Sequence, residues 1–243
     1  MNTYGVRRLL LAAPVLGMAF CASSAMATVS IPLSGFSGIG TPVSFEAQFT
    51  ITGDTLTVVL CNNSTSPSMA PDDVIGSFYF DVVNAGNRPT LTYVSAIGDV
   101  YLTDKDGPDT LQTAAANLKA VNAGDNSWQF KPMNAAMSPF LGFGVGTVGN
   151  SGLSPNNFNG NIVDGMDYSI YAGDVTTSNL DDKLLVKNCI TFTFTGLTGY
   201  TEANIATNVA FGLGTAPDSL LTPAPGAAAL LGLGGLLAGR RRR

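Results

Sequence analysis

The chain has 243 residues, with 12 Lys and Arg against 17 Asp and Glu, and it contains no histidine. The absence of histidine excludes Ser-His-Asp and Cys-His catalysis, imidazole general bases and histidine-based zinc or copper sites. The excess of acidic residues disfavours nucleic acid and anionic lipid as partners. Carboxylate chemistry and the binding of divalent cations remain compatible with this composition.

Residues 1–27 have the three regions of a secretory signal peptide. Two arginines precede an apolar run over residues 9–22, and Ala25 and Ala27 are the small residues of a small-x-small cleavage site. We predict cleavage after Ala27, which makes Thr28 the first residue of the mature protein.

Residues 28–218 have the pattern of a single β-domain. Apolar and polar residues alternate over 43–51 and again over 56–60, with Gly53-Asp54 between them, which predicts a hairpin. Further strands are predicted over residues 74–83, 90–102, 190–195 and 208–213. Only residues 109–121 have a helix-like composition. Short strands separated by Gly, Asn, Asp and Pro, without regular strand–helix alternation, predict one antiparallel β-sandwich of the jelly-roll kind.

An acidic segment in the middle of the domain is a candidate calcium site. Asp104, Asp106 and Asp109 lie close together beside Gly107, as in loops that supply oxygen ligands. No glutamate stands at the twelfth position, so the segment is not an EF-hand, and an acidic turn is the simpler interpretation. A second, weaker group is Asn159, Asn161, Asp164 and Asp167.

Hydrolysis by paired carboxylates would need two carboxyl groups about 5 to 9.5 Å apart. Glu46 and Glu202 are the only glutamates, and Glu46 falls on the polar face of a predicted strand. The pairs Asp72-Asp73 and Asp181-Asp182 are typical of turns. We therefore expect no enzyme.

Four aromatic residues offer a different kind of binding surface. A platform of exposed rings suits the flat faces of sugars, but at these spacings aromatic residues are more typical of a core. The four residues are Trp128, Phe130, Tyr168 and Tyr171.

Two cysteines, Cys61 and Cys189, remain after the signal peptide. In an oxidising compartment such a pair either forms a disulfide or stays buried as free thiols. Cys61 ends one predicted strand and Cys189 begins another, so neighbouring positions in a sheet would bring them together.

The end of the chain has three parts. A Pro-Ala-Pro break within residues 219–225 precedes an apolar run of Leu, Ala and Gly over residues 226–239. The last four residues are Arg240, Arg241, Arg242 and Arg243. Fourteen helical residues span about 21 Å, less than the roughly 30 Å hydrocarbon core, so we expect a marginal membrane-inserted helix. The arginines place its end in the cytoplasm and the domain outside.

This order of features resembles the PEP-CTERM sorting signal. The resemblance is carried by Pro223, Ala224 and Pro225, by the Leu/Gly run and by the four arginines, with Ala224 where the family usually has Glu. It implies a protein exported by a Gram-negative bacterium, inserted transiently in the inner membrane, and processed by signal peptidase and an exosortase-type enzyme. Residues 226–243 would then be an apolar sorting helix with its Arg cluster.

Removal of both terminal segments leaves a strongly acidic domain. Six of the 12 basic residues lie in these segments and all 17 acidic residues lie in the domain, so its formal charge is 6 − 17 = −11. We expect a structural or adhesive protein of the cell surface or extracellular matrix, with an envelope or matrix polysaccharide as its partner. A carbohydrate- or calcium-binding module is the alternative, and a carboxylate-based hydrolase comes third.

Overall fold

The computed structural model describes residues 27–120, 127–132, 142–147, 167–214 and 219–223. The predicted signal peptide up to residue 26 and the sorting tail from Ala224 onward lie outside these ranges. So do Asn159, Asn161 and Asp164 of the second calcium candidate.

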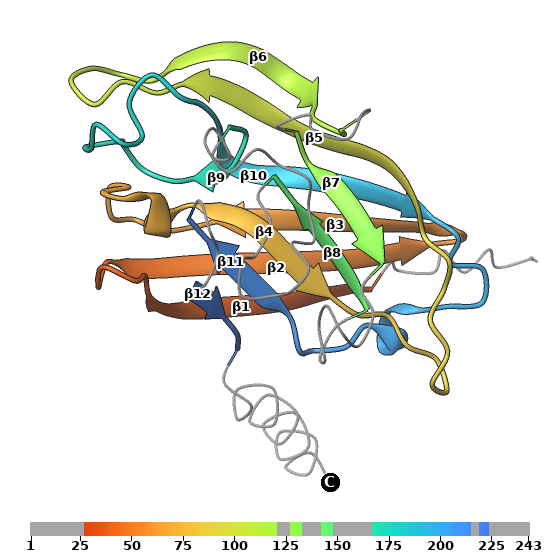
Figure 1. The fold of residues 1–243 in the computed structure, drawn as a ribbon. Coiled ribbons are helices and arrows are strands. Elements are labelled where there is room, and N and C mark those ends of the chain that lie inside the picture. Colours follow the sequence, from red (N-terminus) through yellow and green to blue (C-terminus); the bar gives the residue numbers. More distant parts are fainter. Residues whose placement is uncertain (1–26, 121–126, 133–141, 148–166, 215–218, 224–243) are drawn as a thin grey trace, which may run out of the picture.

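The described residues form an all-β protein with no α-helix (Figure 1). The strands are β1 (Thr28–Phe36), β2 (Pro42–Thr52), β3 (Thr55–Asn62), β4 (Ile75–Phe80), β5 (Thr92–Leu102), β6 (Thr110–Asn117), β7 (Gln129–Pro132), β8 (Phe143–Gly146), β9 (Ile170–Tyr171), β10 (Leu184–Thr195), β11 (Ala210–Leu213) and β12 (Ser219–Leu221). Two short 3-10 turns, η1 (Pro71–Asp73) and η2 (Glu202–Asn204), complete the described elements.

One group of strands follows the order β1-β2-β3-β10-β5-β6, and all of its neighbours are antiparallel. The predicted hairpin is confirmed, because Thr52 pairs with Thr55 across a two-residue turn. Gly53 in this turn has φ +60°, a left-handed conformation that glycine adopts without steric cost.

A second group follows the order β7-β8-β4-β11-β12, again antiparallel, and lies in front of the first in Figure 1. The two-residue strand β9 links the groups, since it pairs in parallel with β10 and antiparallel with β4.

Aromatic side chains fill the space between the two groups. Phe49 of β2 lies 6.2 Å from Phe78 and 5.8 Å from Phe80 of β4, measured between ring centroids. Phe80 also lies 5.9 Å from Phe194 of β10, and all four residues are fully buried. Strands β2 and β10 bury one face, because their inward positions alternate with threonines and other polar residues that point outward. Every residue of β4 is buried.

The helix-like expectation for residues 109–121 is wrong, because residues 110–117 form strand β6 along the edge of β5. Helix propensity favours Ala, Leu and Gln by only a few tenths of a kcal/mol per residue, and hydrogen bonds to a free sheet edge outweigh it. The apolar residues of this segment also do not share one buried face, as they would in an amphipathic helix. Leu111 is exposed, whereas Leu118 is buried. A bulge places Ala115 at φ +48°, and its N–H donates to the Asp99 carboxylate.

Candidate functional site

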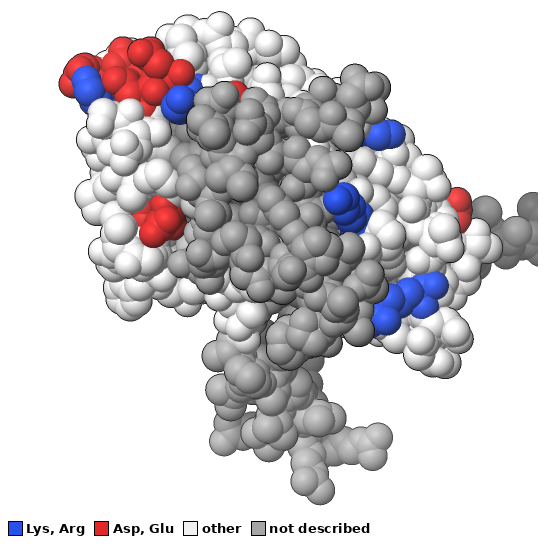
Figure 2. Space-filling view, in the orientation of Figure 1, with Lys and Arg blue, Asp and Glu red and all other residues white. Residues whose placement is uncertain are grey.

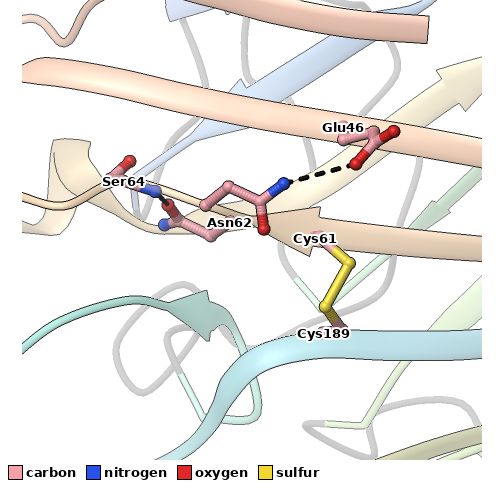
Figure 3. Close-up of a disulfide and its surroundings, with 6 residues drawn as sticks. Glu46, Cys61, Asn62, Ser64 and Cys189 are labelled. Atoms are coloured by element: carbon pink, nitrogen blue, oxygen red, sulfur yellow. Dashed lines mark hydrogen bonds between the residues drawn. A yellow bond between two sulfur atoms is a disulfide. The ribbon is translucent and has the colours of Figure 1, made fainter. Parts of the chain in front are cut away.

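Cys61 and Cys189 are joined by a disulfide (Figure 3). Cys61 on β3 and Cys189 on β10 are directly opposite in the antiparallel register, with their Cα atoms 4.2 Å apart and their Sγ atoms 2.16 Å apart. Of the two alternatives that the sequence left open, the structure therefore contains the bridge. It links two strands in the interior of the first group.

Glu46 lies opposite Cys61 on the neighbouring strand β2 (Figure 3). Its carboxylate accepts hydrogen bonds from Ser30 Oγ at 2.6 Å and from Asn63 Nδ2 at 3.4 Å. The bond from Ser30, followed by one from Gln48, lowers the pKa of Glu46 below its usual range. A carboxyl group that acts as a general acid needs a raised pKa, whereas the pKa of Glu46 is lowered.

Two other carboxylates considered for catalysis accept hydrogen bonds from backbone N–H groups. Glu202 accepts a hydrogen bond from the N–H of Ile51, five residues along β2 from Glu46, which is a separation of roughly 16 Å along the strand. The two glutamates are therefore not brought together as a catalytic pair. Asp73 Oδ2 accepts from the N–H groups of Met69 and Ala70, and this pattern holds a turn.

The first calcium candidate is not assembled into a common site. Asp104 accepts the N–H of Asp106 at 2.9 Å, and Asp106 pairs with Lys105. Asp109 Oδ1 accepts the N–H of Asp104 at 3.3 Å, whereas its Oδ2 is turned inward to Lys187 and Tyr171. Within the residues that the structure describes, no three His, Cys, Asp or Glu side chains are grouped so that they could hold a metal ion. Figure 2 shows acidic side chains gathered at the corner where β5 and β6 are joined.

Asp109 forms a buried cluster with a lysine and two tyrosines. Its side chain is 3% exposed, and Oδ2 accepts from Lys187 Nζ and from the Tyr171 hydroxyl, each at 2.7 Å. Lys187 Nζ also lies 5.6 Å from the centroid of the Tyr101 ring and 5.3 Å from that of Tyr171. Burial, with the neighbouring Asp109 as a further cause, raises the pKa of Tyr171. Tyr171 is therefore a neutral hydrogen-bond donor, and the cluster anchors the start of β6 to β9 and β10.

Replacing Tyr171 with Phe is expected to lower the free energy of unfolding by about 1 to 2 kcal/mol. The variant keeps the ring that Lys187 contacts but removes one donor to a buried carboxylate. Urea denaturation measures the difference. Tyr101→Phe is the matched control, because the contact recorded between Tyr101 and Lys187 involves the ring. Equal midpoints for Tyr171→Phe and the unmodified protein would contradict the role assigned to the hydroxyl.

The four aromatic residues considered as a sugar platform belong to the core. Trp128 and Tyr171 are fully buried, and Phe130 and Tyr168 are half-buried. Trp128 packs edge-on against Phe192 at 5.0 Å and donates its indole N–H to the carbonyl of Tyr168 at 2.8 Å. No flat face of Trp128 or Tyr171 is available to a ligand.

An open pocket of about 510 Å³ lies instead where the β1–β2 turn meets the segment after β3. Its lining residues are Ser34, Gly35, Phe36, Pro42, Val43, Ser44, Asn63, Ser64 and Thr65. Phe36 is 67% exposed. Sequence reasoning missed this pocket, although a phenylalanine within a Gly/Ser-rich turn is an unusual pattern that could have drawn attention to it.

Comparisons of the chain with protein-family models, with curated proteins and with solved structures give no match. Among the residues that the structure describes, no helix has the length and hydrophobicity that a membrane span requires.

Proposed function

We propose that the protein is exported and serves as a structural or adhesive component of the cell surface or extracellular matrix. The Cys61–Cys189 disulfide is the observation that carries the proposal, because stable disulfides form and persist outside the reducing cytoplasm. The predicted signal peptide and the tail that resembles a PEP-CTERM signal support the same location. Signal peptidase and an exosortase-type enzyme are the proposed processing partners, with a transient stage in the inner membrane.

We also propose that the domain is an antiparallel β-sandwich related to jelly rolls. The support comes from ring contacts between strands that share no hydrogen bonds, such as Phe45 of β2 with Phe211 of β11 at 5.5 Å. Such contacts are expected where two sheets pack face to face.

The proposal includes no catalytic activity. Glu46, Glu202 and Asp73 each accept hydrogen bonds that stabilise strands or turns, and Asp109 forms an ion pair with Lys187. A carbohydrate-binding module is the second candidate, and the exposed ring of Phe36 in an uncharged pocket favours it. The calcium-binding version has no comparable support, because the carboxylates of Asp104, Asp106 and Asp109 do not converge.

The intact mass of the protein from its native host tests the proposal. In separated envelope and medium fractions, we expect an N-terminus at Thr28 and the loss of the apolar run that begins at Gly226. A mass two hydrogens below the reduced value would show the disulfide. A chain truncated after Thr222 is the control, because it keeps the described strands and lacks the sorting tail. A full-length protein that keeps its tail in the inner membrane would contradict the proposed processing.

A further inference from the structure

We propose that the pocket between the β1–β2 turn and the segment after β3 binds a neutral carbohydrate chain, which deepens and rests on the proposed adhesive function. The ligand would be an uncharged polysaccharide of the envelope or matrix. This pocket is distinct from the buried aromatic cluster around Trp128 and from the acidic corner at the β5–β6 turn.

Backbone hydrogen bonds hold the walls of the pocket together. Ser37 N–H donates to the carbonyl of Thr41 at 2.9 Å, and this bond closes the turn that presents Phe36. Asn63 N–H donates to the carbonyl of Ser44 at 2.7 Å, and Ser44 N–H donates to Ser64 Oγ at 3.0 Å, so the segment after β3 is joined to the β1–β2 hairpin. The site is therefore preformed, so little conformational entropy is lost when a ligand enters.

The lining of the pocket has the chemistry of a site for hydroxyl-rich, uncharged ligands. No lining residue is charged, although the mature domain carries a formal charge of −11, and the first 18 residues of the mature chain contain no charged side chain at all. Ser34, Asn63 and Thr65 provide hydroxyl and amide groups that both donate and accept hydrogen bonds. An anionic ligand would find no counter-charge here, and the Glu46 carboxylate that accepts from Asn63 would repel it. Sugar hydroxyls match the hydroxyl and amide groups of the lining.

Phe36 supplies the apolar surface that a sugar ring requires. Among the aromatic residues that the structure describes, it alone is exposed, and every other ring is at least half-buried. An exposed ring that lines an uncharged pocket can pack against the C–H face of a pyranose, while the sugar hydroxyls bond to the polar groups of the pocket. Burial of this exposed apolar area is the main driving force that the site offers.

Binding of defined oligosaccharides to the mature protein, purified from its host, tests the assignment. The probes for isothermal titration are the neutral chains cellohexaose, maltohexaose and mannohexaose, with an alginate hexamer as the anionic counterpart. We expect at least one neutral chain to bind and the alginate hexamer not to bind. Binding of alginate alone, or of no neutral chain, would overturn the proposal.

Variants locate the binding. Phe36→Ala is expected to weaken the affinity at least tenfold, and Thr65→Val several-fold, because the second change removes one hydroxyl while keeping the shape of the side chain. Leu111→Ala is the matched control, since Leu111 is an exposed apolar residue on β6, outside the pocket. Unchanged affinity in Phe36→Ala, with an unchanged urea midpoint, would show that the pocket is not the site. A failure of binding leaves the mass measurement above unaffected, so the two proposals fail separately.

Discussion

Reduction of the Cys61–Cys189 disulfide is expected to lower the free energy of unfolding by about 4 to 5 kcal/mol. The two residues are 128 positions apart, so the bridge removes a large loop entropy from the unfolded chain in the chain-entropy model. The bridge also joins directly opposed positions of β3 and β10, which already pair in the folded protein. Most of the effect should therefore come from the unfolded state rather than from new contacts.

Urea denaturation with and without a reducing agent measures this effect. The double variant Cys61→Ser, Cys189→Ser is the control, because its midpoint should equal that of the reduced protein and should not respond to the reducing agent. An identical midpoint for the oxidised and reduced protein would contradict the expectation.

Replacement of Phe80 by Ala is expected to lower the free energy of unfolding by about 3 to 5 kcal/mol. Phe80 is fully buried, and its ring contacts those of Phe49, Phe78 and Phe194 at centroid distances of 5.8, 5.9 and 5.9 Å. Because these rings belong to β2, β4 and β10, the substitution opens a cavity where the two groups of strands meet.

Thermal and urea unfolding of Phe80→Ala provide the measurement. Phe36→Ala removes the same atoms from a ring that is 67% exposed, and we expect it to change the stability by no more than about 0.5 kcal/mol. Similar losses in the two variants would mean that burial between the strand groups does not determine the stability.

The strands that bury only one face could be predicted from the sequence. Residues 43–51 and 190–195 alternate between apolar and polar side chains, and they lie within β2 and β10. Alternation is lost where both faces are covered: every residue of β8 is buried, and its sequence Phe-Gly-Val-Gly has no polar face. Strand β6 is the reverse case, since seven of its eight residues are exposed and hydrogen bonds to β5 alone define it.

The disulfide could also be predicted as one of two alternatives from the sequence, because it depends only on the pairing of two strands. Cys61 and Cys189 lie at the ends of predicted strands, and neighbouring strands place them face to face. The inward orientation of Asp109 was not predictable, because its partner Lys187 is distant in the sequence and lies on another strand. The pocket around Phe36 likewise combines three separate segments, each of which has the pattern of an ordinary turn or strand end.

The disulfide also determines how the molecule responds to mechanical force. If the protein is pulled at β1 and β12, tension passes through the bridge and bypasses the 127 residues between the cysteines. At roughly 3.4 Å per extended residue, about 430 Å of chain is withheld from stretching. The oxidised protein would therefore extend much less under force than the reduced protein.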